Sequence, residues 1–306
     1  MKKPIRTFDL TSPKLIRAII ILGILLLLAS LYGWWTYIRN NPERLFWRAV
    51  DNALQTRGVT RQIVSSGEGQ PDQFLRLHTT PAAGTVGLNK YYQGQDTSVP
   101  TLVTETLGTE TADYIRVAAM NSTDPSQPTP DISSIRNIWA NATPQGLGDS
   151  SGQLYNQFIL GVVPFGNLNI RQRRELIRYM QEQDIYQIDF ASVNRGTDQG
   201  RPVYIYEVSI DTQKYLVALK KFCEYVGSDQ LKDVDPAQYA GSQPLRFQLT
   251  IDVLSRQLII AQQAQGEVSR YHSYGLITPP LKAPDNPVPL EELQQKLQNL
   301  QQQPTQ

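Results

Sequence analysis

The chain has 306 residues, and its 29 basic and 28 acidic side chains leave a net charge of +1, so no global field favours nucleic acid as a partner. A single cysteine, Cys223, excludes an intramolecular disulfide framework and a cysteine-rich zinc site. Because Cys223 sits in an apolar helical pattern, we expect it to be a packed small hydrophobe rather than a reactive thiol.

The first long apolar stretch, residues 18–38, carries no charge over 21 residues. As a helix it would reach roughly 31 Å, enough to cross the hydrocarbon core of a bilayer. A cleaved signal peptide has a shorter apolar core and a small-residue cleavage site, whereas this stretch ends in the interfacial aromatic residues Tyr32, Trp34, Trp35 and Tyr37. We therefore predict a cytoplasmic tail over residues 1–14 and an uncleaved transmembrane anchor over residues 15–38.

Basic residues near this anchor set its expected orientation. The amino side carries Lys2, Lys3, Arg6, Lys14 and Arg17, and the other flank carries Arg39, Arg44 and Arg48. The positive-inside rule then favours a cytoplasmic amino terminus, with the main domain outside the cell membrane.

A helix and a run of strands are expected next. Asn41, Pro42 and Glu43 form a helix start, and apolar residues then recur at spacings of three and four up to Gly58. From residue 59 to 120 the apolar period becomes two, which predicts strands at residues 60–64, 74–78, 86–92, 101–104 and 114–117. Short polar turns between them indicate an antiparallel meander.

The middle of the chain, residues 121–183, is predicted to be a helical insert. It begins with a polar loop, and a short helix capped by Asp131 is expected over residues 131–139. A clearer helix over residues 170–183 carries a basic cluster, namely Arg171, Arg173, Arg174 and Arg178. That cluster is either an ordinary solvated helix face or a surface that touches acidic lipid head groups.

The remaining chain predicts a hairpin, a helix, three strands and a tail. The hairpin runs from residues 186–190 through a turn at 195–200 to residues 203–208, and the helix covers 212–225. Strands are expected over residues 245–253, 257–263 and 267–274. The Pro/Gln-rich tail, residues 285–306, has a narrow stripe of Leu290, Leu293, Leu297 and Leu300. It would dock on the domain, pair with another chain, or stay disordered.

No catalytic or metal-binding signature stands out. The two histidines, His78 and His272, have no paired spacing, and the sequence contains no nucleophile elbow, phosphate-binding loop or dinucleotide fingerprint. We therefore predict no enzymatic activity, no cofactor and no metal.

Several local strings resemble the LolA-like and LprG-like lipoprotein-carrier superfamily. They are residues 200–208 leading into 212–219, residues 249–253 before 258–260, and residues 271–275 followed by Pro279 and Pro280. The resemblance covers residues 40–284 and departs from the superfamily in lacking a lipobox cysteine and in its long insert. It implies an α+β extracytoplasmic domain in which a curved antiparallel sheet, a half-barrel, carries helices on its concave face.

In that superfamily the concavity often holds an acyl chain. The resemblance then implies a cavity lined by Val64, Leu75, Leu77, Leu88, Tyr92, Val103, Ile115, Val117, Ile205 and Leu249. The same residues would equally form a packed core under the helices, and only a long apolar pocket would favour carriage.

Together these features predict a single-pass membrane-anchored envelope domain that binds or senses a lipid or hydrophobic ligand without catalysis. The alternative is an envelope scaffold that has no ligand cavity and contacts another envelope protein through its glutamine-rich tail. Neither hypothesis includes a nucleic-acid partner.

Overall fold

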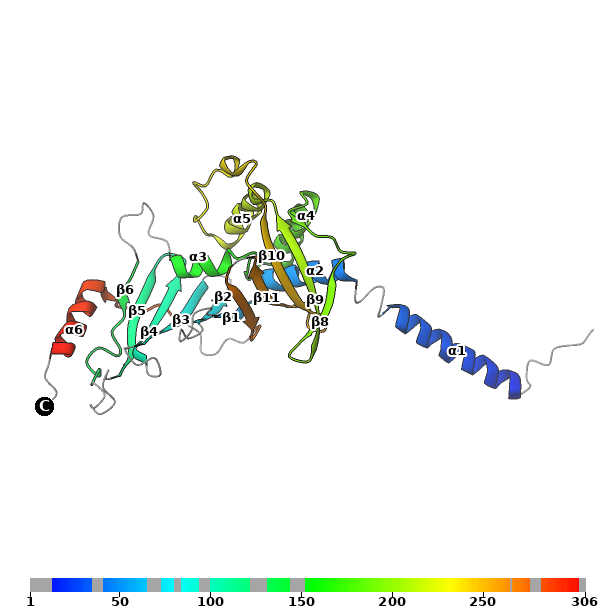
Figure 1. The fold of residues 1–306 in the computed structure, drawn as a ribbon, viewed down its shortest axis with the longest axis horizontal. Coiled ribbons are helices and arrows are strands. Elements are labelled where there is room, and N and C mark those ends of the chain that lie inside the picture. Colours follow the sequence, from blue (N-terminus) through cyan, green and yellow to red (C-terminus); the bar gives the residue numbers. More distant parts are fainter. Residues whose placement is uncertain are drawn as a thin grey trace, which may run out of the picture.

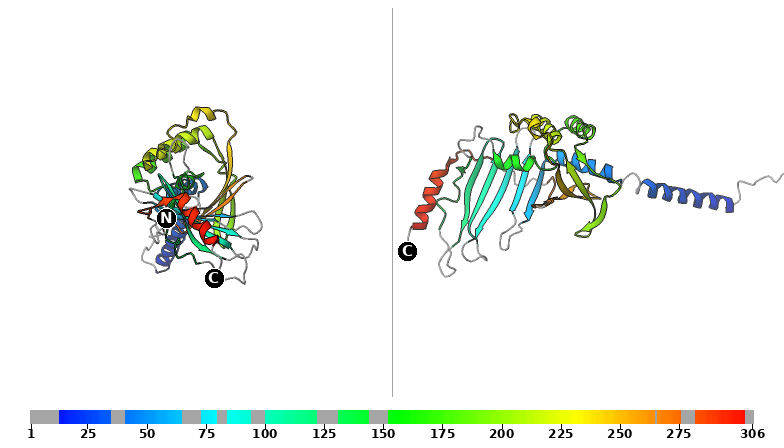
Figure 2. Two further views of the ribbon diagram at one scale, coloured as in Figure 1. Left: turned by 90° about the vertical axis from the view of Figure 1, so that its left-hand side faces the viewer. Right: turned by 45° about the horizontal axis from the view of Figure 1, so that its top comes forward.

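The computed structural model describes residues 13–34, 41–64, 73–79, 84–93, 100–121, 131–143, 152–264, 266–275 and 282–302. In these ranges one open sheet runs through the domain, and helices lie over one of its faces (Figures 1 and 2). Its strand order is β13-β6-β5-β4-β3-β2-β1-β12-β11-β10-β9-β7, with β8 paired to β9. The α+β class is confirmed, whereas the half-barrel curvature stays a prediction.

The first half of the sheet is the predicted meander. Its strands are β1 (Gly58–Val64), β2 (Gln73–Thr79), β3 (Gly84–Gln93), β4 (Pro100–Thr109) and β5 (Asp113–Met120). All neighbouring pairs are antiparallel, as short polar turns require.

The second half contains β9 (Arg201–Ile210), β10 (Leu245–Asp252), β11 (Leu258–Gln263) and β12 (Val268–His272). Antiparallel pairing of β12 with β1 joins the two halves into one sheet. The three predicted strands of this region are confirmed.

The predicted hairpin needs a correction. Its first strand is β8 (Asn194–Asp198), which lies where the sequence indicated a turn, while β7 (Tyr186–Gln187) pairs only with the far end of β9. The reversal occurs at Gln199 and Gly200, whose φ angles are 47° and 77°. A two-residue turn with both φ angles positive matches the twist of a tight hairpin, so the connection is shorter than the polar run suggested.

In the described ranges, four helices cover the sheet: α2 (Pro42–Leu54), α3 (Gln153–Ile159), α4 (Ile170–Glu182) and α5 (Thr212–Val226). Polar side chains cap the starts of α2 and α4: Asn41 accepts from the Arg44 N–H of α2 at 3.0 Å, and Asn169 forms a capping box with Gln172 on α4. A short 3-10 helix, η2 (Pro236–Tyr239), lies beside α5.

The short helix expected over residues 131–139 is wrong. Residues 133–137 form turns, and the Asp131 carboxylate accepts from the Ser133 N–H at 2.8 Å. The aspartate therefore caps a turn, since this local side-chain bond competes with continued helix.

The main core lies between the helices and the sheet. The predicted stripe of α2 is buried, and its Phe46 is fully covered and packs against Tyr186 and Tyr206. The Tyr206 hydroxyl donates to the carbonyl of Pro42 at 2.9 Å, which ties the start of α2 to β9. Cys223 is buried, as predicted, and burial raises the pKa of its thiol to about 11.

The carboxy-terminal tail docks on the domain. Strand β13 (Val288–Pro289) pairs in parallel with β6 (Ala140–Asn141), and α6 (Leu290–Gln302) follows it. Leu293 is 2% exposed in a second, smaller core with Val117, Ile135 and Ala140. Of the three alternatives for this tail, the structure shows docking.

Helix α1 (Pro13–Gly33) stands apart from these cores, and its isoleucine and leucine side chains from Ile20 to Leu31 are each 53–61% exposed. Over the described part of the chain, no helix has both the length and the apolar character of a membrane span. The predicted transmembrane anchor over residues 15–38 is therefore not supported, and residues 35–38 lie outside the described residues.

Candidate functional site

The residues predicted to line a cavity are not gathered in one place. Leu75, Leu77 and Leu249 belong to the main core, with 4%, 3% and 0% of their surface exposed. Val117 belongs to the second core, and Ile115 packs against it. Val103 is half-buried, and the backbones of Leu88 and Tyr92 lie opposite Leu75 and Leu102, while the side chains of Leu88 and Tyr92 lie outside the described residues.

Strand register places two of the predicted residues on the other face of the sheet. Arg61 lies opposite the buried Leu75, so Val64, three positions later, points away from the helices. Ile205 lies between Tyr204 and Tyr206, whose buried side chains face the main core, so it also points outward. These two residues cannot line the same cavity as Leu75.

Among the side chains that the structure describes, the helix-bearing face carries two separate cores, with the backbones of β3 and β4 between them. On β4, Thr104 and Thr106 lie opposite Val117 and Ile115 of the second core. Helix α3 covers β4 near Gly108, where an added Cβ would lie 2.8 Å from the Leu154 Cβ. Thr104 is 4% exposed, and its hydroxyl has no hydrogen-bond partner among the described residues. The part of the face between the two cores, which includes Thr104 and Thr106 of β4, is here termed the inter-core strip. It was not recognised from sequence because its limits depend on where the two cores end.

A second candidate site is a groove of about 1240 Å³ between α2, α4 and the β10–β11 turn, here termed the arginine groove. Six arginines line it against the carboxylates Glu43 and Asp51. The six are Arg44, Arg48, Arg173, Arg174, Arg178 and Arg256.

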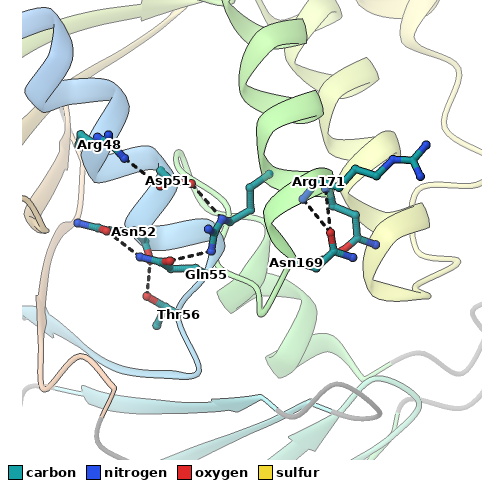
Figure 3. A network of polar contacts seen from close by, with 9 residues as sticks. Arg48, Asp51, Asn52, Gln55, Thr56, Asn169 and Arg171 are labelled. Atoms are coloured by element: carbon teal, nitrogen blue, oxygen red, sulfur yellow. Dashed lines mark hydrogen bonds and ion pairs between the residues drawn. The ribbon is translucent and has the colours of Figure 1, made fainter.

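A polar network holds the walls of the groove together (Figure 3). Asp51 Oδ1 lies 3.0 Å from Arg173 Nε, and Arg173 Nη1 donates to Gln55 Oε1 at 2.7 Å. Gln55 in turn donates to Asn52 at 2.8 Å, and Asn52 Nδ2 donates to the carbonyl of Arg256 at 2.7 Å. The network thus connects α4, α2 and the β10–β11 turn.

The remaining charge of the groove is positive. Arg173 is paired with Asp51, and Arg48 lies 3.8 Å from the same carboxylate. Arg44, Arg174, Arg178 and Arg256 have no acidic partner within 4.0 Å among the described residues. Such uncompensated guanidinium groups can bind an anion with oxygen acceptors.

The sequence indicated only part of this groove. The basic cluster of α4 was recognised, but Arg171 does not line the groove. Arg44 and Arg48 were used only for orientation, although their spacing of four places them on one face of a helix. Arg256 could not be assigned to the groove from the sequence, because it lies in the β10–β11 turn, far from α2 and α4 along the chain.

No protein-family model matches this chain, and no curated protein matches it. A search of solved structures finds LprF from Mycobacterium bovis, 13% identical with a TM-score of 0.40, covering 81% of this chain and 97% of that one. It also finds the LolA superfamily protein NE2245 from Nitrosomonas europaea, 11% identical with a TM-score of 0.22, covering 80% and 96% of the two chains. Both neighbours are of the kind that the sequence resembles, but similarity this low carries no argument about the superfamily, a site or a ligand of this chain.

Proposed function

We propose that this protein is a non-catalytic domain of the cell envelope that binds a lipid or another hydrophobic ligand on the inter-core strip. The observation that carries the proposal is that, among the described side chains of the helix-bearing face, the two apolar cores are separated where the backbones of β3 and β4 lie. An apolar ligand on the strip would join the two cores between Leu75 and Ile115. The apolar surface that it covers would be removed from contact with water, which favours binding. Of the ten predicted residues, Leu75, Ile115 and Val117 border this strip.

We further propose that α1 attaches the domain to a membrane, with the domain on the extracytoplasmic side. Its isoleucine and leucine side chains are exposed on every side, and no described element packs against it closely. A helix that is apolar all round is unfavourable in water and is stable in contact with lipid. The proposed domain begins near residue 40 and includes the insert over residues 121–183.

Mass spectrometry of organic extracts from the full chain, purified in detergent, tests ligand binding. We expect a co-purifying lipid in the unsubstituted protein and a marked loss of it in Thr106→Phe, because the larger side chain would fill the inter-core strip. Thr60→Phe is the matched control, since Thr60 lies on the outward face of β1. Lipid bound around α1 should be present in equal amount in all three proteins. The difference in lipid content between the variants therefore measures binding on the inter-core strip.

Equal lipid content in the three folded proteins would contradict ligand binding on the strip. That result would favour the scaffold hypothesis, which the complete burial of Leu249 in the main core also supports. Cross-linking in intact membranes would then identify a protein partner.

A further inference from the structure

We propose that the arginine groove binds the phosphate-bearing head group of an anionic phospholipid at the membrane surface. This site is distinct from the inter-core strip, and it lies on α2 and α4 rather than on the sheet. The inference rests on the proposed membrane attachment of α1, which places the bilayer near the groove. It does not depend on ligand binding on the inter-core strip.

The charge of the groove favours a phosphate. Arg173 has its charge balanced by Asp51 and holds the walls, so it is not free to bind an anion. Arg174 and Arg178 are exposed on one face of α4, and Arg44 is exposed on α2 across the groove. Guanidinium groups present paired N–H donors that match two phosphate oxygens, which makes arginine suited to this ligand.

Apolar side chains beside these arginines favour a lipid as the source of the phosphate. Ile170 and Leu254 line the same groove and are 57% and 53% exposed, and the half-buried Trp47 lines the groove and packs against the main core. A free phosphate would gain nothing from exposed apolar residues. A lipid would place its phosphate on the arginines and its glycerol and upper acyl carbons on Ile170 and Leu254.

The groove also lies close to α1. Helix α1 ends at Gly33 and α2 begins at Pro42, so the chain between them can reach at most roughly 30 Å. Arg44 and Arg48 stand in the first two turns of α2. In Figure 1, α2 and α4 occupy the end of the domain that is nearest to α1. A membrane that holds α1 would therefore lie within reach of the groove.

The walls of the groove are set without a ligand. The connections from Asp51 to Arg173 and from Asn52 to the Arg256 carbonyl fix α2 against α4 and against the β10–β11 turn. A site formed in advance loses less entropy on binding than one that must be assembled.

Titration of the full chain in a neutral detergent tests the proposal, with native mass spectrometry as the readout. The probes are dioctanoyl phosphatidylglycerol, dioctanoyl phosphatidylcholine and inorganic phosphate. We expect saturable binding of phosphatidylglycerol that weakens as salt is added, and binding of phosphatidylcholine that is at least about tenfold weaker. Equal binding of the two lipids would overturn the proposal. Phosphate binding as tight as that of phosphatidylglycerol would also overturn it, because the site would then be one for free anions.

Paired substitutions locate the site. Arg174→Gln combined with Arg178→Gln should weaken phosphatidylglycerol binding at least about tenfold. Arg136→Gln combined with Arg246→Gln removes the same charge from exposed positions outside the groove and should leave binding unchanged. An equal loss of phosphatidylglycerol binding in both double variants would show a general charge effect and would overturn the proposal. Circular dichroism verifies that each variant is folded.

Apolar substitutions separate a lipid site from a phosphate site. Leu254→Ser combined with Ile170→Ser should weaken phosphatidylglycerol binding without changing the response to inorganic phosphate. No effect of this pair would overturn the assignment to lipid. None of these substitutions touches the inter-core strip, so failure here and failure of the co-purification experiment are distinguishable.

Discussion

Asp51 on α2 and Arg173 on α4 form an ion pair, with Oδ1 3.0 Å from Nε, that joins the two walls of the arginine groove. Their side chains are 21% and 13% exposed, so the pair is largely shielded from water. Arg173 also donates to Gln55, which places three side chains in one network. The pair therefore couples the packing of α4 to that of α2.

Breaking this pair should destabilise the domain. We expect Asp51→Ala to lower the free energy of unfolding by about 1–3 kcal/mol, since it leaves a shielded guanidinium without its acceptor. A double-mutant cycle with Arg173→Ala, measured by urea denaturation, should give a coupling energy above about 0.5 kcal/mol. Arg48→Ala is the control: its side chain is 64% exposed and 3.8 Å from Asp51, so we expect a change below about 0.5 kcal/mol. Additive single effects would contradict the coupling.

Asp113 gives the domain a specific dependence on pH. Its carboxylate accepts from the backbone N–H groups of Gln153 at 3.0 Å and Leu154 at 3.3 Å, in the first turn of α3. The N-cap residue of that helix, Gly152, has no side chain to do this. Burial raises the pKa of Asp113 above 3.8, although these hydrogen bonds oppose the shift.

A raised pKa in the folded state means that the folded protein retains the Asp113 proton at pH values where the unfolded chain has released it. Stability from this group is therefore present below pH 3.8 and is lost as pH rises through the raised pKa. We expect Asp113→Asn to lack this loss, because asparagine keeps a carbonyl acceptor for α3 without titrating. Urea denaturation of both proteins between pH 3.5 and neutrality measures the difference, and identical pH profiles would refute this role.

Gly152 is required where the chain enters α3. A Cβ at this position would lie 1.8 Å from the Thr109 carbonyl oxygen, which is backbone and cannot move aside alone. We expect Gly152→Ala to lower the free energy of unfolding by more than about 2 kcal/mol. Gly161→Ala is the matched control, since its nearest neighbour is 3.6 Å away. Comparable stability of the two variants in urea would show that α3 can shift without cost.

Much of this fold could be predicted from local patterns. The stripe and the Asn41 cap of α2 identified that helix, and period-two alternation located β1 to β5, because each signal is contained in a few consecutive residues. Strand β8 could not be predicted, since residues 194–198 are polar and become a strand only through pairing with β9.

The candidate sites depend on tertiary structure more strongly. The face on which Val64 or Ile205 lies follows from register, and a shift of one residue reverses it. Arg256 lines the arginine groove from the β10–β11 turn, where its carbonyl accepts from Asn52 Nδ2 on α2. Sequence alone therefore located the arginines of α4 but not the groove that they share.

The docking of α6 depends on Leu293, which is 2% exposed against Val117, Ile135 and Ala140. We expect Leu293→Ala to lower the free energy that holds α6 on the domain by about 2–5 kcal/mol, through lost burial and the cavity left behind. Because the two cores are separate among the described side chains, the effect should be local opening rather than global unfolding. Hydrogen exchange should then speed up in α6 and leave α2 unchanged, while the exposed control Gln295→Ala should have no effect. Unaltered exchange in Leu293→Ala would mean that the strand pairing of β13 with β6, not the leucine, holds the tail.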